Sequence, residues 1–463
     1  MQVGSGGGDP HDHDRLHVLD WAKLLVFLRA TQPMVVESFD LEHEGPSREQ
    51  FLSRLQGQIA SRGIVDVLRK GVKHQWAQVT LFYGTPTPGN DDARIKHVQN
   101  IFSVTRQVRY SPDEQALALD LVLFINGLPV ATFELKNNLT KQPVDDAIRQ
   151  YREDRSPQEP LFQVGRCLAH FAVDEHEVWF CTQLTGKKSW FLPFNKGYKQ
   201  GKGNPPNPEG LQTAYLWEEV LERSSLTNII EKYAQLVTEE EGQGAKKRTV
   251  RRQIFPRYHQ LDVVRNLLAD AQTAGTGRRY LIQHSAGSGK SNSIAWLAHQ
   301  LVELKRGGQP LFDSIIVVTD RIVLDSQLKT TIKQFTQVNA IFGHADHSSD
   351  LKKFLEDGKK IVSTTIQKFP FVLDEIQGSL SNRSFALIID EAHSGQGGSA
   401  TRSMSRVLGQ DGEEEEDDQT IQDRINAAIE SRKMLKNADS YRLHRHTQEQ
   451  NAAALRYTVH GRR

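Results

Sequence analysis

The stretch Gln283-His-Ser-Ala-Gly-Ser-Gly-Lys-Ser291 decides the fold of the second half of the chain. It follows a strand-like run at Tyr280–Gln283 and precedes helical spacing from Ser291 to Lys305, so it predicts a glycine-rich turn between a strand and a helix. Glycines in such a turn let backbone N–H groups surround phosphate oxygens, and the helix N-terminus adds a positive dipole. The stretch therefore predicts a phosphate-binding loop. Gly287, Ser288 and Gly289 would bind the phosphates through their backbone N–H groups.

Two side chains of this loop carry the predicted nucleotide chemistry. Lys290 would reach the β- and γ-phosphates of ATP, and the Ser291 hydroxyl would join Mg²⁺. The first position of the pattern G-x-x-x-x-G-K-[ST] holds His284 instead of glycine. The alternative is a glycine-rich turn that only starts a helix, but the strand–turn–helix context favours phosphate binding.

A second motif, Leu387-Ile-Ile-Asp-Glu-Ala-His393, ends an apolar strand in two acids about 100 residues after the loop. Asp390 would hold Mg²⁺ through water, and Glu391 would orient and deprotonate the attacking water. Taken alone, these acids could be an ordinary helix cap. Combined with the phosphate-binding loop, they predict an ATPase core.

The segments around these motifs alternate between strand-like and helical patterns. Strands are predicted at Ser314–Thr319, Lys360–Thr364 and Phe385–Ile389, with helical segments between them. Such alternation predicts an α/β domain built on a doubly wound parallel sheet.

The first half of the chain carries a separate set of charged residues in apolar strands. Asp120 lies in Leu117–Phe124, and Glu134 and Lys136 lie on a strand that returns after a hairpin turn at Asn126-Gly127. Glu134 and Lys136 share one face because side chains repeat every second residue. Asp120 and Glu134 could bind one Mg²⁺ while Lys136 polarises the attacking water or the developing phosphate charge, as in nucleases with a D…(D/E)xK motif.

The alternative is an Asp in a loop and a surface Glu-x-Lys strand, which is common for so short a motif. Unpaired charges in apolar strands are costly, which favours a functional site. The segment Ala147–Arg155 also resembles the helix that follows this motif in RecB-type nucleases. Its Q-x-x-x-Y element is incomplete, because Tyr151 fits but Ala147 precedes it by four residues and Gln150 stands next to it.

Composition excludes several classes of protein. The chain has 463 residues, of which 38% are hydrophobic and 25% charged, as in soluble globular proteins of about three domains. Its 58 basic and 57 acidic residues give a net charge of +1, which still allows a local basic patch for nucleic acid. Cys167 and Cys181 have no metal-ligand spacing and suit a reducing cytosol. No apolar run approaches the length of a membrane span, and Met1–Asp14 lacks the features of a signal peptide.

Shifts in composition along the chain predict its segments. We expect a disordered lead over 1–15, a nuclease domain over 16–240, a basic linker over 241–254, an ATP-binding domain over 255–408, an acidic linker and helix over 409–441, and a tail over 442–463.

Asp390-Glu-Ala-His393 resembles motif II of superfamily 2 helicases and translocases. Two segments that resemble DNA-contacting motifs follow the expected order, and they would place Arg321 and either Thr364 or Thr365 on DNA. Upstream, Arg257-Tyr-His-Gln260 resembles the adenine-reading element, so Gln260 would contact adenine.

The whole arrangement closely resembles the restriction (R, HsdR) subunit of type I restriction-modification systems, in which a PD-(D/E)xK nuclease domain precedes a RecA-like motor lobe. Histidine at the first loop position is typical of that family. The resemblance implies a cytoplasmic protein that uses ATP and Mg²⁺, joins methyltransferase (M) and specificity (S) subunits, pumps duplex DNA and cuts it. For the basic cluster Lys246–Arg252, a phosphate contact and a solvated linker both remain open.

Family members are far longer, because a second RecA-like domain and a docking region follow. After Tyr441 the family pattern stops, and one codon choice for Arg442–Gln450, read in another frame, spells the family's Ala-Phe-Thr-Ala-Thr-Pro-Lys motif. We therefore expect a frameshift that truncates the motor after its first lobe. We also expect nucleotide binding with little turnover and no translocation, because the second lobe supplies arginine fingers.

Two other functions fit the same motifs. One is a stand-alone superfamily 2 helicase-nuclease of DNA repair, and the other is a remnant that binds DNA or ATP without chemistry. Purification with or without methyltransferase subunits would separate the first from a restriction subunit. Mg²⁺-dependent cleavage that is lost in Lys136→Ala would exclude the second.

Overall fold

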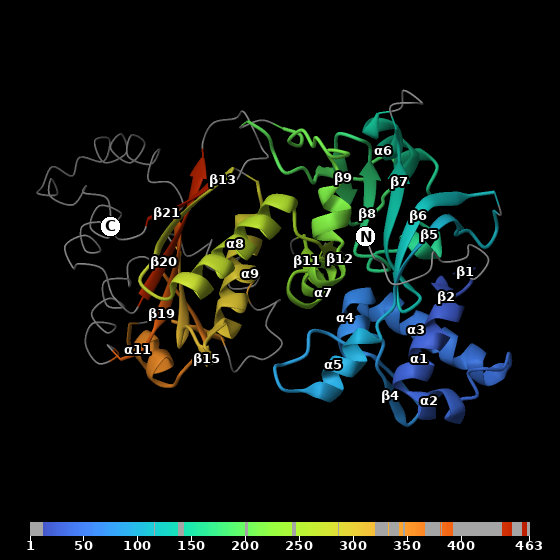
Figure 1. Cartoon of the computed structure of the whole chain (residues 1–463), viewed down its shortest axis with the longest axis horizontal. Coiled ribbons are helices and arrows are strands. Elements are labelled where there is room, and N and C mark those ends of the chain that lie inside the picture. The colour runs from blue at the N-terminus through green and yellow to red at the C-terminus, as the bar shows by residue number, and fades with distance from the viewer. Residues whose placement is uncertain are drawn as a thin grey trace, which may run out of the picture. The chain divides into compact units, whose positions relative to one another are not determined.

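The computed structural model describes the chain in two compact units (Figure 1). The N-terminal unit ends at Tyr258 and the C-terminal unit begins at His259. The described residues are 13–114, 116–137, 143–199, 202–242, 247–285, 287–319, 332, 342–345, 348–365, 380, 382–391, 438–446 and 456–460.

A six-stranded sheet forms the centre of the N-terminal unit. Its order is β10-β9-β8-β7-β6-β5, and the β7–β8 pair is parallel whereas the other neighbours are antiparallel. The predicted hairpin is confirmed, with positive φ angles of 50° at Asn126 and 79° at Gly127. The strands are Phe102–Arg109 (β5), Ala118–Ile125 (β6), Leu128–Leu135 (β7), Ala169–Val173 (β8), Val178–Cys181 (β9) and Leu192–Pro193 (β10).

The helices of this unit begin and end at residues that local chemistry explains. The apolar spacing of Leu16–Leu28 predicts a helix, and the observed helix begins at Trp21, because the Asp20 side chain caps it by accepting a hydrogen bond from the Lys23 amide at 2.9 Å. The similar spacing of Phe51–Leu68 predicts one helix, which is divided into two at Gly63, where φ is 79°. The helices are Trp21–Thr31 (α1), Pro33–Ser38 (α2), Pro46–Arg62 (α3), Ile64–Lys70 (α4), Asp91–Val98 (α5), Val144–Glu153 (α6) and Arg223–Lys232 (α7).

Short elements complete the N-terminal unit. The apolar run Val79–Tyr83 predicts a strand, of which only Val79 belongs to one. The disordered lead predicted through residue 15 is wrong for His13–Asp14, which pairs with a second strand. Residues 1–12 lie outside the described part of the chain. The elements are His13–Asp14 (β1), Leu19–Asp20 (β2), Val72–His74 (β3), Ala77–Val79 (β4), a 3₁₀ turn at Pro160–Phe162 (η3) and a π-helical turn at Leu216–Val220 (η4).

The region predicted as a basic linker is instead an antiparallel ribbon. Strands Gln235–Glu241 (β11) and Arg248–Ile254 (β12) pair along their full length, from Gln235↔Ile254 to Glu241↔Arg248. Acidic side chains of β11 face basic ones of β12, so the ribbon is held by cross-strand ion pairs as well as by backbone bonds. The pairs are Lys247–Glu240 at 2.9 Å, Arg248–Glu241 at 3.0 Å, Arg252–Glu239 at 3.2 Å and Arg252–Glu241.

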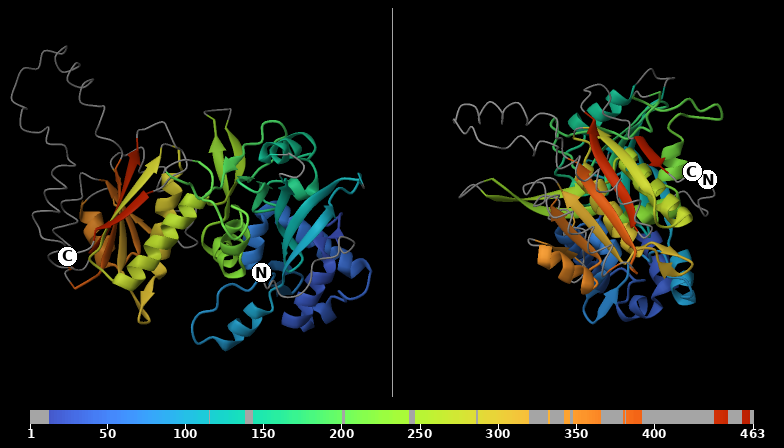
Figure 2. Two further views of the ribbon diagram at one scale, coloured as in Figure 1. Left: turned by 45° about the horizontal axis from the view of Figure 1, so that its top comes forward. Right: turned by 90° about the vertical axis from the view of Figure 1, so that its left-hand side faces the viewer.

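The C-terminal unit is built on a seven-stranded sheet whose strands lie side by side in Figure 2. Its order is β17-β18-β16-β19-β20-β13-β21, and every neighbouring pair is parallel except β13–β21. The predicted parallel α/β sheet is therefore confirmed, apart from the antiparallel edge strand. The strands are Arg279–Ser285 (β13), Ser314–Thr319 (β16), Phe342–His344 (β17), Ile361–Thr365 (β18), Phe385–Glu391 (β19), Ala438–His446 (β20) and Arg456–His460 (β21).

Three helices of this unit are described: Tyr258–Ala274 (α8), Lys290–Glu303 (α9) and Ser348–Glu356 (α11). A small hairpin joins Lys305–Arg306 (β14) to Gln309–Pro310 (β15). The parts of the predicted tail over 442–463 that the structure describes belong to β20 and β21. Of the acidic linker and helix expected over 409–441, residues 409–437 lie outside the described part of the chain. No described helix is both long enough and apolar enough to cross a membrane.

Candidate functional site

The hairpin β6–β7 places Asp120 and Glu134 opposite each other. Leu121 pairs with Phe133, so the next residues along the two antiparallel strands, Asp120 and Glu134, face each other. The Leu135 amide donates to Asp120 Oδ2 at 2.8 Å, which fixes the carboxylate against β7. The structure therefore brings together the two acids that the sequence singled out.

Gln107 of β5 holds the other side of Asp120. The ladder pairs Arg106 with Leu121 and Val108 with Leu119, which leaves Gln107 opposite Asp120. Its Nε2 donates to Asp120 Oδ1 at 3.2 Å, and its φ of 52° lies in the left-handed region that non-glycine residues rarely adopt. Such outliers cluster at functional sites, and this contact was missed by the sequence analysis.

Glu134 is fully buried and forms an ion pair with Arg155. The guanidinium donates to Glu134 Oε1 at 2.8 Å and to the Ala118 carbonyl at 3.0 Å. Burial raises the pKa of Glu134 to about 7, with Arg155 acting to lower it and Asp120 to raise it further. Arg155 was not predicted, although it ends the helical segment that the sequence analysis identified.

Lys136 reaches helix α6. Its Nζ donates to Gln150 Oε1 at 2.8 Å, so the lysine that shares a strand face with Glu134 is held by the residue next to Tyr151. Helix α6 buries one face through Val144, Ala147, Ile148 and Tyr151. Residue 147 therefore faces the core, where a small apolar alanine fits. The glutamine that reaches Lys136 stands instead at position 150.

A buried hydrogen-bond network ties α6 to the sheet beneath the site. Thr132 Oγ1 bonds to the Tyr151 hydroxyl at 2.8 Å and to His170 Nδ1 at 2.8 Å. All three side chains are buried, and burial lowers the pKa of His170 to about 3. Because each member restricts the rotamers of the others, the network fixes the helix that carries Gln150.

The neutral state of His170 predicts a loss of stability in acid. A folded-state pKa of about 3 lies below the ordinary value of 6.5, so the stabilising contribution is present above pH 6.5 and is lost as pH falls. At pH 5.5 the loss is about 1.4 kcal/mol. Amide hydrogen exchange of β7 and β8 in the full chain, compared at pH 7.5 and 5.5, measures it.

His170→Gln is expected to remove this pH dependence, whereas the exposed His176→Gln is the matched control and should behave like the wild type. The raised pKa of Glu134 changes the stability with pH in the opposite direction, but Glu134 is present in the wild type and in both variants, so its effect cancels in the comparison. Equal pH slopes in the wild type and His170→Gln would contradict the assignment.

The acids fit a divalent cation that prefers oxygen ligands. Glu134 Oε2 is buried and has no hydrogen-bond partner among the described residues, and Asp120 stands across the strand pair. No group of three His, Cys, Asp or Glu side chains in the described part of the chain could hold a metal. A cation here would take two carboxylates and complete its shell with water or backbone oxygen, in competition with Arg155.

The glycine-rich loop has a left-handed backbone at two of its glycines. Gly287 and Gly289 have φ angles of 70° and 80°, and Gly289 precedes the first turn of α9. His284, at the position where glycine was expected, bonds through Nδ1 to Ser288 Oγ at 2.9 Å. Burial, His259 and Lys290 lower the pKa of His284 to about 3, so a neutral imidazole supports the loop.

Lys290 forms an ion pair with Asp390, which joins the two predicted ATPase motifs. Asp390 is 5% exposed and belongs to β19, while the loop follows β13 two strands away. Gln260 is buried and donates from Nε2 to the Gly289 carbonyl at 2.8 Å. The described contact of Gln260 is thus with the loop, and its predicted contact with adenine stays a prediction.

The predicted DNA-contacting residues are only partly described. Thr364 is fully buried in β18 and Thr365 is 7% exposed, so this structure places both hydroxyls in the sheet instead of on a surface. Arg321 lies outside the described residues, and so does the side chain of Glu391.

Two family models each match about a third of the chain. Residues 42–189 match the type I restriction enzyme R protein N terminus (HSDR_N), and residues 259–411 match the SWI2/SNF2 ATPase. The first range contains Asp120, Glu134 and Lys136, and the second contains the predicted phosphate-binding loop and Asp390.

Curated relatives carry the same family name. The type I restriction enzyme HindI endonuclease subunit of Haemophilus influenzae is 27% identical over 297 residues, which are 60% of this chain and 26% of that protein. Two proteins of Methanocaldococcus jannaschii are named for type I restriction enzyme endonuclease subunits. MjaIXP is 26% identical over a region that covers 62% of this chain and 28% of its own length. MjaVIIIP is 22% identical over a region that covers 81% of this chain and 37% of its own length. The chain thus spans between about a quarter and two fifths of these relatives.

Proposed function

We propose that this chain, which is an HsdR-like protein, acts as the restriction subunit of a type I restriction-modification complex. In this role it would bind duplex DNA and ATP and cleave DNA in a reaction that requires Mg²⁺, as part of a complex that translocates DNA. Its partners would be methyltransferase and specificity subunits, and it would work in the cytoplasm.

One observation carries the nuclease half of this proposal. Asp120 and Glu134 face each other on adjacent strands, and Lys136 follows directly after the end of β7 and is held by Gln150. This arrangement supports a PD-(D/E)xK fold for the N-terminal unit. A bound Mg²⁺ would supply Lewis-acid activation of water and of the scissile phosphate.

The chain's own residues would perform the remaining steps at this site. Asp120 and Glu134 would hold the cation, and Lys136 would donate to the water or to a phosphate oxygen as negative charge develops. Gln150 and Tyr151 would position the lysine and its helix. Arg155 would have to release Glu134 Oε1 for the carboxylate to bind the cation with both oxygens.

For the motor half, we propose a RecA-like lobe with ATP on the loop at Gly287–Ser291. Lys290 would contact the β- and γ-phosphates, while Ser291 and Asp390 would hold the nucleotide's Mg²⁺ and Glu391 would activate water. The observed Lys290–Asp390 pair supports this assignment, because the two side chains lie where the phosphates and the cation would meet. Arg321 remains the proposed DNA contact and Gln260 the proposed adenine contact, whereas the burial of Thr364 and Thr365 in β18 does not support a DNA contact for either.

The proposal is tested by incubating duplex plasmid DNA with the chain, alone and copurified with methyltransferase and specificity subunits. We expect Mg²⁺-dependent cleavage, with ATP stimulation in the assembled complex. Cleavage by the isolated chain with no association with methyltransferase subunits would favour a repair enzyme. The absence of cleavage and of ATP binding in both preparations would refute the proposal.

Gly289→Ala is expected to weaken ATP binding more than Gly287→Ala does. Both glycines have left-handed backbones, which cost an L-residue about 1–2 kcal/mol. A Cβ at Gly289 would also lie 2.5 Å from Gln260 Nε2, whereas a Cβ at Gly287 would meet nothing within 4 Å. Because the end of the Gln260 side chain can move aside but would lose its hydrogen bond to Gly289, we expect a further loss of about two- to tenfold, measured by equilibrium binding of a fluorescent ATP analogue.

The difference between the two variants should vanish when Gln260 is also replaced by alanine. If it persists in that background, the contact between Gln260 and the loop is not its cause.

A further inference from the structure

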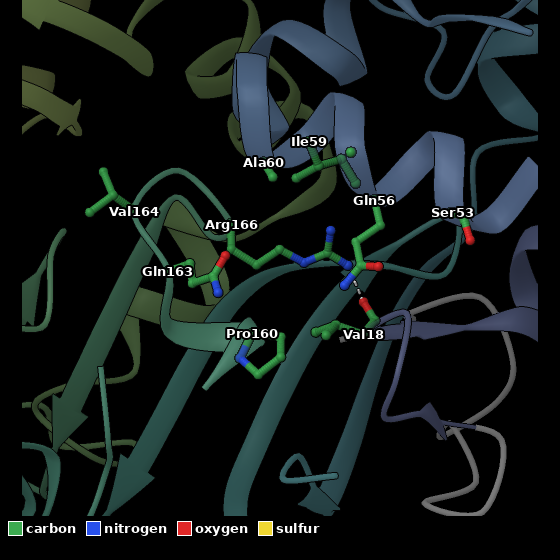
Figure 3. Close-up of a pocket in the computed structure, with 10 residues that line it drawn as sticks. Val18, Ser53, Gln56, Ile59, Ala60, Pro160, Gln163, Val164 and Arg166 are labelled. Carbon is green, nitrogen blue, oxygen red and sulfur yellow. Dashed lines mark hydrogen bonds between the residues drawn. The ribbon is translucent and has the colours of Figure 1, made fainter. Parts of the chain in front are cut away.

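A cavity of about 220 Å³ lies in the N-terminal unit between helix α3 and the segment that follows η3 (Figure 3). Ser53, Gln56 and Ile59 line it from the helix, and Gln163 and Arg166 line it from the opposite side. It is separate in sequence and lining from the acids on β6 and β7.

Arg166 is the charged group of this cavity. The side chain is only 5% exposed, and its Nη2 donates to the carbonyls of His17, at 2.9 Å, and Val18. Its Nε and Nη1 are buried and have no hydrogen-bond partner among the described residues. Figure 3 shows the guanidinium between Gln56 and Val18, inside the ring of lining residues.

Among the residues that the structure describes, no carboxylate balances this charge within the cavity. The described lining residues other than Arg166 are all uncharged, and burial lowers the pKa of Arg166 only to about 10, so it is cationic at neutral pH. Asp14, the acid next to β1, accepts hydrogen bonds from the backbone and bonds to the ring of His17. A buried cation without an anionic partner is costly, and so is each unpaired N–H donor.

We propose that the cavity binds a small phosphate-class oxyanion, with Arg166 as its charged donor. Arginine N–H groups form strong charge-assisted bonds to phosphate oxygens, so a small shift of the buried Arg166 head group toward the cavity would let Nε or Nη1 bind the anion. The Gln163 amide and the Ser53 hydroxyl add neutral donors at the exposed edge of the cavity. The volume is below the roughly 300 Å³ at which pockets for larger ligands begin, so it suits a free phosphate ion or a phosphate monoester.

Titration of the full chain with inorganic phosphate at pH 7.5, followed by calorimetry and ³¹P NMR, tests this site. All variants carry Lys290→Ala, so that binding of phosphate to the glycine-rich loop contributes less to the measured signal. We expect saturable binding that Gln163→Glu weakens by at least tenfold, because the new carboxylate would pair with Arg166 and repel the anion. Gln50→Glu adds the same charge to an exposed position of α3 that does not line the cavity, and it should leave binding unchanged.

Arg166→Gln should abolish the same binding, but it also removes the bonds to His17 and Val18 and could impair folding. Gln163→Glu is therefore the deciding variant, because residue 163 is exposed. Adenosine monophosphate distinguishes the sources: competition at the Gln163-sensitive site indicates a monoester, and binding of phosphate alone indicates the free ion. The proposal is overturned if no saturable binding occurs at millimolar phosphate, or if Gln163→Glu and Gln50→Glu have equal effects.

Discussion

Lys290→Ala is expected to weaken ATP binding by about 10- to 100-fold, the range that corresponds to losing a charged hydrogen bond of about 1.5–3 kcal/mol. The substitution removes the proposed contact with the β- and γ-phosphates. It also leaves Asp390, which is 5% exposed, without the cation that now pairs with it. One substitution therefore disturbs two residues, Lys290 and Asp390, that are proposed to bind ATP and its Mg²⁺.

Equilibrium binding of a fluorescent ATP analogue in the presence of Mg²⁺ measures this effect. Lys353→Ala, on the exposed side of α11, removes the same charge from the same unit and should leave the affinity unchanged. Lys290→Arg keeps the charge and should retain part of the affinity. An unchanged affinity in Lys290→Ala would place the nucleotide elsewhere.

Lys136→Ala is expected to reduce Mg²⁺-dependent DNA cleavage by about 10²–10³-fold, as removal of a single donor to developing negative charge does in other enzymes. The lysine donates to Gln150, so its head group is held in place before substrate binds. Gln150→Ala should give a smaller loss, because it releases the lysine without removing its charge.

Conversion of supercoiled plasmid to nicked and linear forms measures the cleavage rate. Lys188→Ala removes an exposed charge from the same unit and is the matched control. Binding of Mg²⁺ by calorimetry gives a second readout, which Lys136→Ala should leave nearly intact and Glu134→Gln should weaken. Equal cleavage rates for Lys136→Ala and Lys188→Ala would exclude the proposed nuclease site.

Short-range chemistry made much of both candidate sites predictable. The two-residue turn at Asn126-Gly127 pairs Ile125 with Leu128, and a register shift between Leu123 and Phe124 then brings Asp120 opposite Glu134 instead of Phe133. Likewise, the order of strand, glycines and helix was enough to locate the loop at Gly287–Lys290. In each case the decisive contacts are separated by few residues or follow from strand pairing.

Contacts made by distant packing were not predictable in the same way. Arg155 reaches Glu134 only because the end of α6 packs over the sheet, and Gln107 faces Asp120 through an unusual backbone angle. The burial of Thr364 also depends on neighbouring strands, so a motif alone could not reveal it. The ribbon β11–β12 was misjudged because a charged, exposed hairpin has the composition of a linker.

That ribbon has a consequence for how the chain would respond to salt when it meets DNA. A lysine or arginine that neutralises a DNA phosphate normally releases a counterion, which makes binding salt-dependent. Lys247, Arg248 and Arg252 already face carboxylates of β11, so a phosphate contact there would exchange one anion for another. Few counterions would be freed by this stretch, and the salt dependence of DNA binding would originate in other parts of the protein.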